Sequence, residues 1–199
     1  MASVRSTVAT SDPCGADLHG PRTSLGGADL HGPRISLRPG TITDAAALHA
    51  LIVEHLAEGH LLPRELAEIA VHADRFIVAV ADGRIVGCAE LAPLSRTVSE
   101  VRSLVVSAEA RSMGVGTSML DELVTRATAA GFEKLCAFTH APRYFVHLGF
   151  SIVPHVWLPE KILTDCRSCV QFRRCGQYAV IRELHRAPQA CVPLAALHG

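Results

Sequence analysis

The feature that most constrains the fold is a strand-like run that passes through a glycine-containing loop into a helix. Residues 100–120 read EVRSLVVSAEARSMGVGTSML, in which an apolar run ends at Val106 and Arg111, Gly114 and Gly116 follow. Glycines let backbone N–H groups approach an anion closely, and a helix N-terminus adds the positive end of its dipole. The segment therefore predicts a cradle for pyrophosphate oxygens, built where a strand of an α/β sheet leads into a helix.

Two other phosphate-binding motifs do not fit this segment. A dinucleotide fingerprint needs a third glycine and an acidic residue about 20 positions further on. The third-glycine position is Met119. A phosphate-binding loop of the nucleotide hydrolases ends in Gly-Lys-Ser/Thr, which is not present in the segment. Both classes of nucleotide site are therefore excluded here.

Strand-like and helix-like patterns alternate on both sides of this segment. The dipeptide Asp82-Gly83 between two β-rich runs predicts an antiparallel hairpin. A meander of strands followed by a strand, a helix and a strand predicts a mixed α/β sheet. The expected strands are 35–38, 76–80, 85–91, 100–106, 134–139, a strand opening at 149–150, and 178–184; the expected helices are 43–59, 65–71, 115–130 and 142–148.

The two ends of the chain differ from its middle. Residues 15–25 (GADLHGPRTSL) and 27–37 (GADLHGPRISL) form a near-perfect tandem copy rich in glycine and proline. Without apolar periodicity such a segment cannot bury enough surface to order itself. We therefore expect a flexible extension over 1–33, a second flexible tail over 185–199, and one catalytic domain over 34–184.

Charge and hydropathy limit the partners. The chain has 19 Lys and Arg and 19 Asp and Glu, so its formal net charge is zero and no global field draws in nucleic acid or an anionic membrane. Its apolar stretches are interrupted well short of the ~20 residues that a membrane span requires. We expect a cytoplasmic protein that recognises small molecules.

The phosphate segment and its context also resemble a known family. The pattern Arg-x-x-Gly-x-Gly after SLVVSAEAR, the hairpin GRIVGCAEL and the segment YFVHLGF are similar to motifs of the GNAT acetyltransferases. The resemblance implies a mostly antiparallel mixed sheet with helices on both faces, a V-shaped splay between strands 4 and 5, and acetyl-CoA bound in that splay. The residues it implies for acetyl-CoA are Leu104, Val105, Val106, Arg111, Gly114, Val115, Gly116, Thr117, Ser118 and Phe145.

Three further segments resemble one branch of that superfamily, the short stand-alone N-acetylglutamate synthases. They are GHLLPRE, SEVRSLVV and LPEKILTDCRSCVQFRRC, in this order along the chain. The resemblance implies transfer of acetyl to the α-amine of L-glutamate, the first step of arginine biosynthesis, and it is compatible with a homodimer.

A glutamate site needs cations for two carboxylates. By resemblance, the residues placed around the amino acid are Arg38, Leu62, Arg64, Arg102 and Thr139. Each arginine has an alternative reading as a solvated surface side chain. Arg102 is flanked by apolar residues in its strand, so it needs an anionic partner or exposure to solvent.

The resemblance places Glu100 and Ser103 at the catalytic centre. Glu100 is the candidate general base, acting directly or through a water, and its alternative role is that of an ion-pair partner. Many GNAT enzymes have a tyrosine where this chain has Phe145, with Tyr144 adjacent. Two rivals stay open: an acetyltransferase for another small amine, an antibiotic or a protein N-terminus, and a non-catalytic acyl-CoA-binding protein.

Seven cysteines and no secretory signal argue against a disulfide framework. Cys166, Cys169 and Cys175 could supply three thiolates to zinc, although only one Cys-x2-Cys pair is present, and the alternative is reduced cysteines in the segment 159–176. No metal is part of the predicted site. Cys88 and Cys136 lie in apolar strand runs and are expected in the core.

Overall fold

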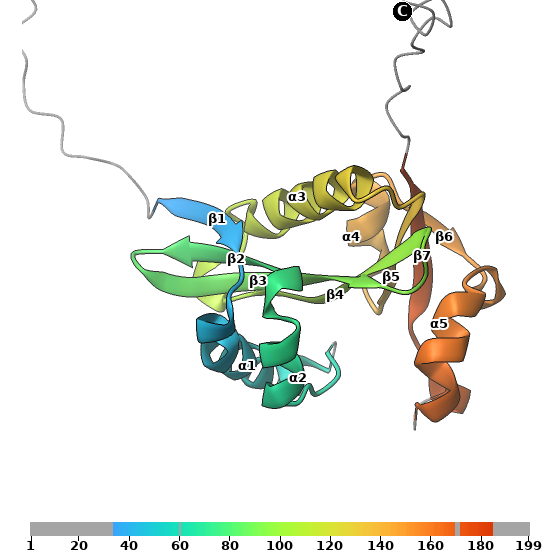
Figure 1. Ribbon diagram of the computed structural model, residues 1–199, viewed down its shortest axis with the longest axis horizontal. Helices are drawn as coiled ribbons and strands as arrows, with labels where there is room; N and C mark the ends of the chain where they lie inside the picture. Colours follow the sequence, from blue (N-terminus) through green and yellow to red (C-terminus); the bar gives the residue numbers. More distant parts are fainter. Residues whose placement is uncertain (1–33, 60, 170–171, 185–199) are drawn as a thin grey trace, which may run out of the picture. The chain divides into compact units, whose positions relative to one another are not determined.

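The computed structural model describes residues 34–59, 61–169 and 172–184 (Figure 1). The extensions predicted for 1–33 and 185–199 lie outside these residues. Within the described part of the chain, no helix is both long enough and apolar enough to cross a membrane.

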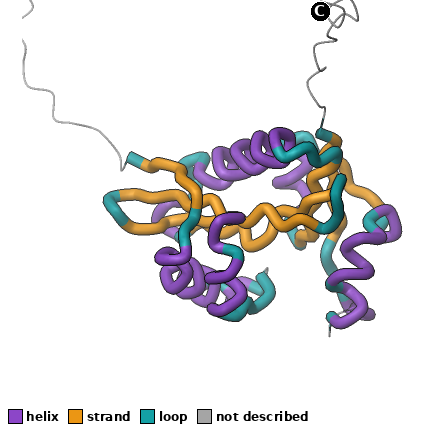
Figure 2. Tube along the Cα trace, in the orientation of Figure 1, coloured by secondary structure: helices purple, strands orange, loops and turns teal. Residues whose placement is uncertain are grey.

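The described chain forms a seven-stranded sheet in the order β1-β2-β3-β4-β5-β7-β6 (Figure 2). Every neighbouring pair is antiparallel except β4 and β5, which run parallel. The predicted mixed, mostly antiparallel sheet is therefore confirmed. The last strand along the chain, β7, lies between β5 and β6 rather than at an edge. The strands are β1 (Ile35–Pro39), β2 (Phe76–Ala81), β3 (Arg84–Pro93), β4 (Val98–Val106), β5 (Lys134–Thr139), β6 (Ser151–Val153) and β7 (Tyr178–Glu183).

Helices cover both faces of the sheet, as the resemblance implied. In Figure 1, α3 and α4 lie above the sheet, and α1, α2 and α5 lie below it. The chain between β6 and β7 contains α5, which the sequence pattern did not predict. The helices are α1 (Ala45–Glu54), α2 (Leu66–Val71), α3 (Val115–Ala129), α4 (Pro142–His147) and α5 (Pro159–Thr164).

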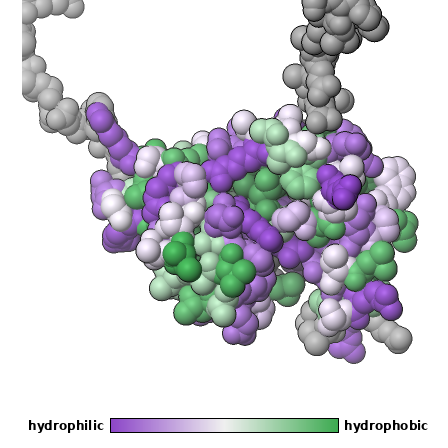
Figure 3. Space-filling model, viewed as in Figure 1, coloured by the Kyte–Doolittle hydropathy of each residue, from purple (hydrophilic) through white to green (hydrophobic). Residues whose placement is uncertain are grey.

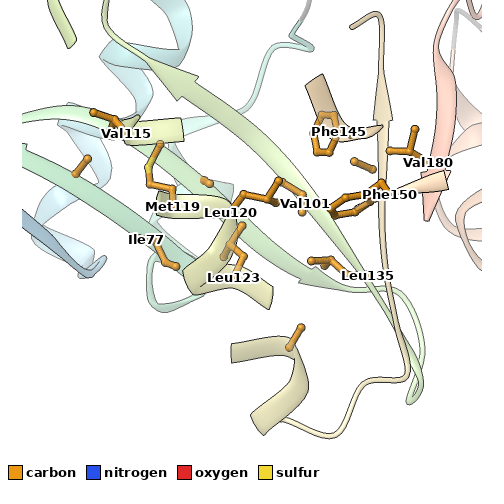
Figure 4. Packing of buried hydrophobic residues seen from close by; sticks show 14 of the residues in the cluster. Ile77, Val101, Val115, Met119, Leu120, Leu123, Leu135, Phe145, Phe150 and Val180 are labelled. Atoms are coloured by element: carbon orange, nitrogen blue, oxygen red, sulfur yellow. The ribbon is translucent and has the colours of Figure 1, made fainter. Parts of the chain in front are cut away.

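The main core lies between the sheet and α3. Met119, Leu120 and Leu123 are fully buried on one face of α3, and they lie close to Ile77 and Val101 of the sheet (Figure 4). Full burial of one such side chain contributes about 1.5–3 kcal/mol. A second cluster, which includes Leu48 and Ile52, packs α1 against the opposite face. The sheet is therefore held rigidly from both sides, which fixes the strands that carry the site.

The predicted antiparallel hairpin at Asp82-Gly83 is present between β2 and β3. Asp82 and Gly83 both have positive φ, at 49° and 77°. Two consecutive left-handed residues match the twist of the flanking strands, and Asp-Gly tolerates that conformation well. The hairpin thereby sets β2 beside β3, and β3 pairs in turn with β4, the strand at the centre of the site.

Candidate active site

A cleft of about 1170 Å³ lies where β4 and β5 diverge. It is lined by the loop before α2, by β4 and the end of β5, by the start of α3, by α4, and by α5 with the turns that follow it. In Figure 3 the surface is hollowed between the part formed by α1 and α2 and the part formed by α5. The cleft thus joins elements that lie more than 100 residues apart.

The floor of the cleft is made by the divergence of β4 and β5. The two strands pair only from Val98 opposite Lys134 to Val101 opposite Ala137. Beyond Val101, β4 keeps β3 as its partner, and within the described residues β5 offers it none. This is the splay that the resemblance implied. Backbone groups freed in this way can hydrogen-bond an extended ligand as an additional strand would.

A β-bulge lies in β4 at the point where the strands diverge. Ser103 and Leu104 together face the single residue Ala89 of β3, because Arg102 pairs with Glu90 and Val105 pairs with Cys88. Ser103 has φ 48°, a conformation that few non-glycine residues adopt. Bulges re-aim side chains, and here the Ser103 hydroxyl accepts a hydrogen bond from Arg64 Nη1 at 3.2 Å.

The start of α3 forms one end of the cleft, which we call the cofactor end (residues 104–117). Gly114 is the N-cap, with φ 77°, and the backbone N–H groups of the first turn follow it. A Cβ added to Gly116 would lie 2.8 Å from the Tyr144 hydroxyl, so a side chain would crowd this surface. Arg111 donates to the Val106 carbonyl at 3.1 Å and pairs with Glu58 at 2.5 Å.

Charged side chains form the opposite end of the cleft, which we call the acceptor end. The residues that line it are Arg64, Glu68, Glu100, Arg102, Ser103, Lys161 and Asp165. We count with them the buried Glu90, which does not line the cleft but pairs with Arg64.

Arg64 is nearly buried at this end and is held by two carboxylates. It donates to Glu68 through Nε at 3.0 Å and Nη2 at 2.7 Å, and to the buried Glu90 through Nη1 at 2.8 Å. Burial acts to lower the pKa of Arg64, but hydrogen bonding to Glu68 and the charge of Glu90 raise the pKa above its ordinary value. Arg64 is therefore a fixed cation with a defined orientation.

Glu100 is the centre of a second network. Its carboxylate accepts from Arg102 Nε at 2.6 Å, and Lys161 Nζ lies 2.6 Å from Oε1 and 2.8 Å from Oε2. Arg102 and Lys161 both also donate to Asp165, Lys161 at 2.8 Å. Burial acts to lower the pKa of Arg102, and the charge and hydrogen bond of Glu100 raise it overall. Arg102 thus has the anionic partners that its apolar strand requires.

The structure brings together most of the predicted site residues. Leu62, Arg64, Arg102 and Thr139 line the cleft with Glu100 and Ser103. Leu104, Val105, Val106, Arg111, Gly114, Val115, Gly116, Thr117 and Phe145 line it as well.

Arg38 and Ser118, which the resemblance assigned to the substrate and to acetyl-CoA, are not among the residues that line the cleft. Arg38 makes a bidentate pair with Asp44, at 2.7 and 2.8 Å, where edge strand β1 leads toward α1. This pair holds the pKa of Asp44 well below its usual range, with Thr41 assisting. Arg38 therefore stabilises the entry to α1. Ser118 lies one residue further along α3 than Thr117, the last residue of its first turn to reach the cleft.

Lys161 and Asp165 are functional candidates that the sequence reasoning missed. They stand four residues apart at α5, so their side chains lie on one side of the helix. The signal in the sequence was the spacing Lys-x3-Asp in LPEKILTDC, preceded by Pro159 at a position that favours a helix start. Nothing in that spacing indicates that α5 folds back over β4.

Cysteines also line the acceptor side of the cleft, namely Cys166, Cys169 and Cys175. All three are free and partly buried. Burial raises the pKa of Cys166, and Lys161 acts in the opposite direction. Within 34–59, 61–169 and 172–184, no group of three or more His, Cys, Asp or Glu side chains is arranged to hold a metal ion.

The remaining described cysteines are in the core, as expected. Cys88 and Cys136 are fully buried. Burial raises the pKa of Cys88 to about 12 and that of Cys136 further still. Neither thiol is available as a nucleophile near neutral pH.

Comparison with known proteins gives a consistent picture. The sequence profile of the acetyltransferase (GNAT) family matches residues 46–150. An uncharacterized N-acetyltransferase of Chlorobaculum tepidum is 26% identical over 148 residues, which are 74% of this chain and 96% of that protein. An amino-acid acetyltransferase of Neisseria meningitidis is 28% identical over 167 residues, which are 83% of this chain and 37% of that protein.

Among solved structures, the chain is similar to N-acetylglutamate synthase from Neisseria gonorrhoeae complexed with coenzyme A and N-acetyl-glutamate. The TM-score is 0.70 at 27% identity, covering 78% of this chain and 36% of that one. The chain therefore spans little more than a third of the length of these Neisseria proteins.

Proposed function

The chain belongs to the acetyltransferase (GNAT) family, and we propose that it transfers the acetyl group of acetyl-CoA to the α-amine of L-glutamate. The Neisseria relatives support this proposal, one by its name as an amino-acid acetyltransferase and one by its complex with coenzyme A and N-acetyl-glutamate. The observation that carries the proposal is that one cleft joins a helix-capped anion cradle to three cations, Arg64, Arg102 and Lys161, which ion pairs hold in place. The product would enter arginine biosynthesis at its first step.

The order of residues along the cleft indicates in which direction acetyl-CoA would lie when bound. Its pyrophosphate would bind the backbone N–H groups around Gly114 and Gly116, and its pantetheine arm would follow the unpaired edge of β4 from Val106 towards Ser103. The thioester would then reach the β-bulge, beside the cations of the acceptor end. This direction places the acetyl group between the two ends of the cleft.

The proposed reaction is direct transfer. The substrate ammonium first loses a proton, the neutral amine forms a bond to the acetyl carbonyl carbon, and the C–S bond breaks so that coenzyme A leaves as a thiolate that takes up a proton. Glu100 remains our candidate to receive the ammonium proton through a water, although both of its oxygens already bind cations. Ser103 is our second catalytic candidate, and its position in the β-bulge at the point where β4 and β5 diverge supports this role.

The balance of cations and carboxylates at the acceptor end supports a second candidate function. Its cations Arg64, Arg102 and Lys161 face four carboxylates. Since that end carries no net positive charge, another small amine is the alternative acceptor.

An acceptor panel separates the two functions. Purified protein with acetyl-CoA is assayed by thiol release against L-glutamate, L-glutamine and a diamine, with acetyl-CoA alone as the control for uncoupled hydrolysis. We expect L-glutamate to give a kcat/KM at least about tenfold above the others, equivalent to ~1.4 kcal/mol of transition-state binding. Full activity on the diamine and none on glutamate would overturn the proposal in favour of the alternative.

A further inference from the structure

The acceptor end depends on a segment that lies beyond the part of the chain matched to the family. The family match ends at residue 150, whereas Lys161 and Asp165 belong to α5 and the turn that follows it. Both line the cleft, and α5 lies on the same side of the sheet as α1 and α2 (Figure 1). This segment is therefore where the acceptor end can differ between relatives that share the same cofactor end.

The carboxylates of the second network differ in their exposure. The Glu100 side chain is 3% exposed and contacts Arg102 and Lys161 from the strand, whereas the Asp165 side chain is 37% exposed and contacts the same two cations from α5. Removing a buried carboxylate from its cations leaves uncompensated charge, whereas a half-exposed carboxylate can turn into water at small cost. Asp165 is thus the partner that another carboxylate can replace.

One oxygen of Asp165 bridges the two cations. Its Oδ2 accepts from Lys161 Nζ at 2.8 Å and from Arg102 Nη2. The Lys161 side chain is 14% exposed and the Arg102 side chain 24% exposed, so little of either cation is left to bind a second anion while Asp165 is in place. A carboxylate on an acceptor molecule would need the same donors.

We propose that Asp165 is a specificity-determining residue, which competes with the carboxylate of the acceptor for Lys161 and Arg102. The inference rests on the proposed function, since it concerns an amino-acid acceptor at the same site. An acceptor with a side-chain carboxylate replaces Asp165 at both cations. An acceptor with an amide in that position cannot, because an amide carries no charge to exchange for that of Asp165.

Competition and a purely structural role predict opposite changes in acceptor binding when Asp165 is removed. If Asp165 only supported the site, its removal would weaken the binding of every acceptor. If it competes, Asp165→Asn frees the two cations and strengthens the binding of a dicarboxylate, because the apparent affinity rises with the fraction of molecules whose cations are free.

The experiment combines a binding probe with kinetics. Glutarate has two carboxylates and no amine, so it reports on the cations without turnover. Its Kd is measured by calorimetry on the coenzyme A complex of the wild type, Asp165→Asn, Lys161→Gln and the control Glu160→Gln. KM values for L-glutamate and L-glutamine are measured on the same proteins, and thermal melts verify folding.

We expect Asp165→Asn to lower the glutarate Kd and the glutamate KM by about tenfold, with the glutamine KM unchanged. Lys161→Gln should raise the glutarate Kd and the glutamate KM, and Glu160→Gln should change neither. A glutarate Kd that rises or stays constant in Asp165→Asn overturns the inference, whatever the wild type acetylates. Tighter glutarate binding in a protein that does not acetylate glutamate would instead refute the proposed function alone.

Discussion

The two ends of the cleft recognise their ligands by different means. The cofactor end is formed by one continuous stretch between Leu104 and Thr117, which includes the N-terminus of α3 and its backbone N–H groups. The acceptor end is made of side chains from the loop before α2, from β3, from β4 and from α5, and they are joined into ion-pair networks. One end therefore depends on a local conformation, and the other depends on the packing of distant elements.

Because of this difference, the two ends should tolerate different side-chain substitutions. A backbone cradle accepts most side-chain changes provided that its glycines remain, because its donors are N–H groups. A buried ion-pair network is sensitive to the loss of any member, because each loss leaves a charge without its partner. Substitutions at the two ends should therefore change different binding constants.

The largest effect is expected from Glu100→Gln at the acceptor end. Loss of this buried carboxylate leaves Arg102 and Lys161 with Asp165 alone and should cost about 3 kcal/mol of unfolding free energy. The kcat/KM for glutamate should fall by about 100-fold if Glu100 also receives a proton. The acetyl-CoA Kd, measured by calorimetry, should be unchanged.

Glu122→Gln is the control for this variant. Glu122 pairs with Arg126 on the exposed side of α3, so the same substitution there should cost at most about 1 kcal/mol. If Glu100→Gln weakens acetyl-CoA binding as strongly as it lowers catalysis, the two ends are not separable and the comparison fails.

An intermediate effect is expected from Gly116→Val at the cofactor end. The added side chain would point at the Tyr144 hydroxyl, 2.8 Å from the new Cβ, and would crowd the N–H groups of the first turn of α3. We expect acetyl-CoA affinity to fall at least about tenfold, or ~1.4 kcal/mol. The glutarate Kd should remain that of the wild type.

Gly176→Val is the matched control, since its Cβ would meet His140 at an ordinary 3.6 Å. Equal acetyl-CoA binding by Gly116→Val and the wild type would show that the cofactor does not approach the start of α3.

The smallest effect is expected from Asp44→Asn, which lies outside both ends. Arg38 holds the pKa of Asp44 well below its usual range, so the folded state favours the charged carboxylate. Its contribution is complete above about pH 4 and is lost as the pH falls towards the lower folded-state pKa. We expect Asp44→Asn to cost about 1 kcal/mol at pH 7.

Urea denaturation at pH 7 and pH 3 checks this pH dependence. The difference in unfolding free energy between the wild type and Asp44→Asn should be smaller at pH 3. The kinetic constants for glutamate should not change, because Arg38 and Asp44 do not line the cleft. A raised glutamate KM in Asp44→Asn or Arg38→Gln would return Arg38 to the substrate site.

The sequence by itself determined the features that depend on neighbouring residues. Asp82-Gly83 specified the hairpin, and Gly114 and Gly116 specified the helix-capped cradle, because the conformations that glycine permits are set within a few residues. The apolar periodicity of α3 specified the face that packs on the sheet. Family resemblance added Arg64, Glu100 and Arg102, all of which reach the cleft.

Only the tertiary structure decided which charges meet. It placed Lys161 against Glu100 and Asp165 against Arg102, in both cases more than 60 residues away in sequence, and it paired Arg38 with Asp44. It also placed the bulge at Ser103, which depends on the register between β3 and β4. A backbone turn is stabilised by local interactions, whereas a side-chain network forms where packing brings distant charges together. The sequence therefore predicts the cofactor end and several members of the acceptor end, but not which of those charged side chains pair with one another.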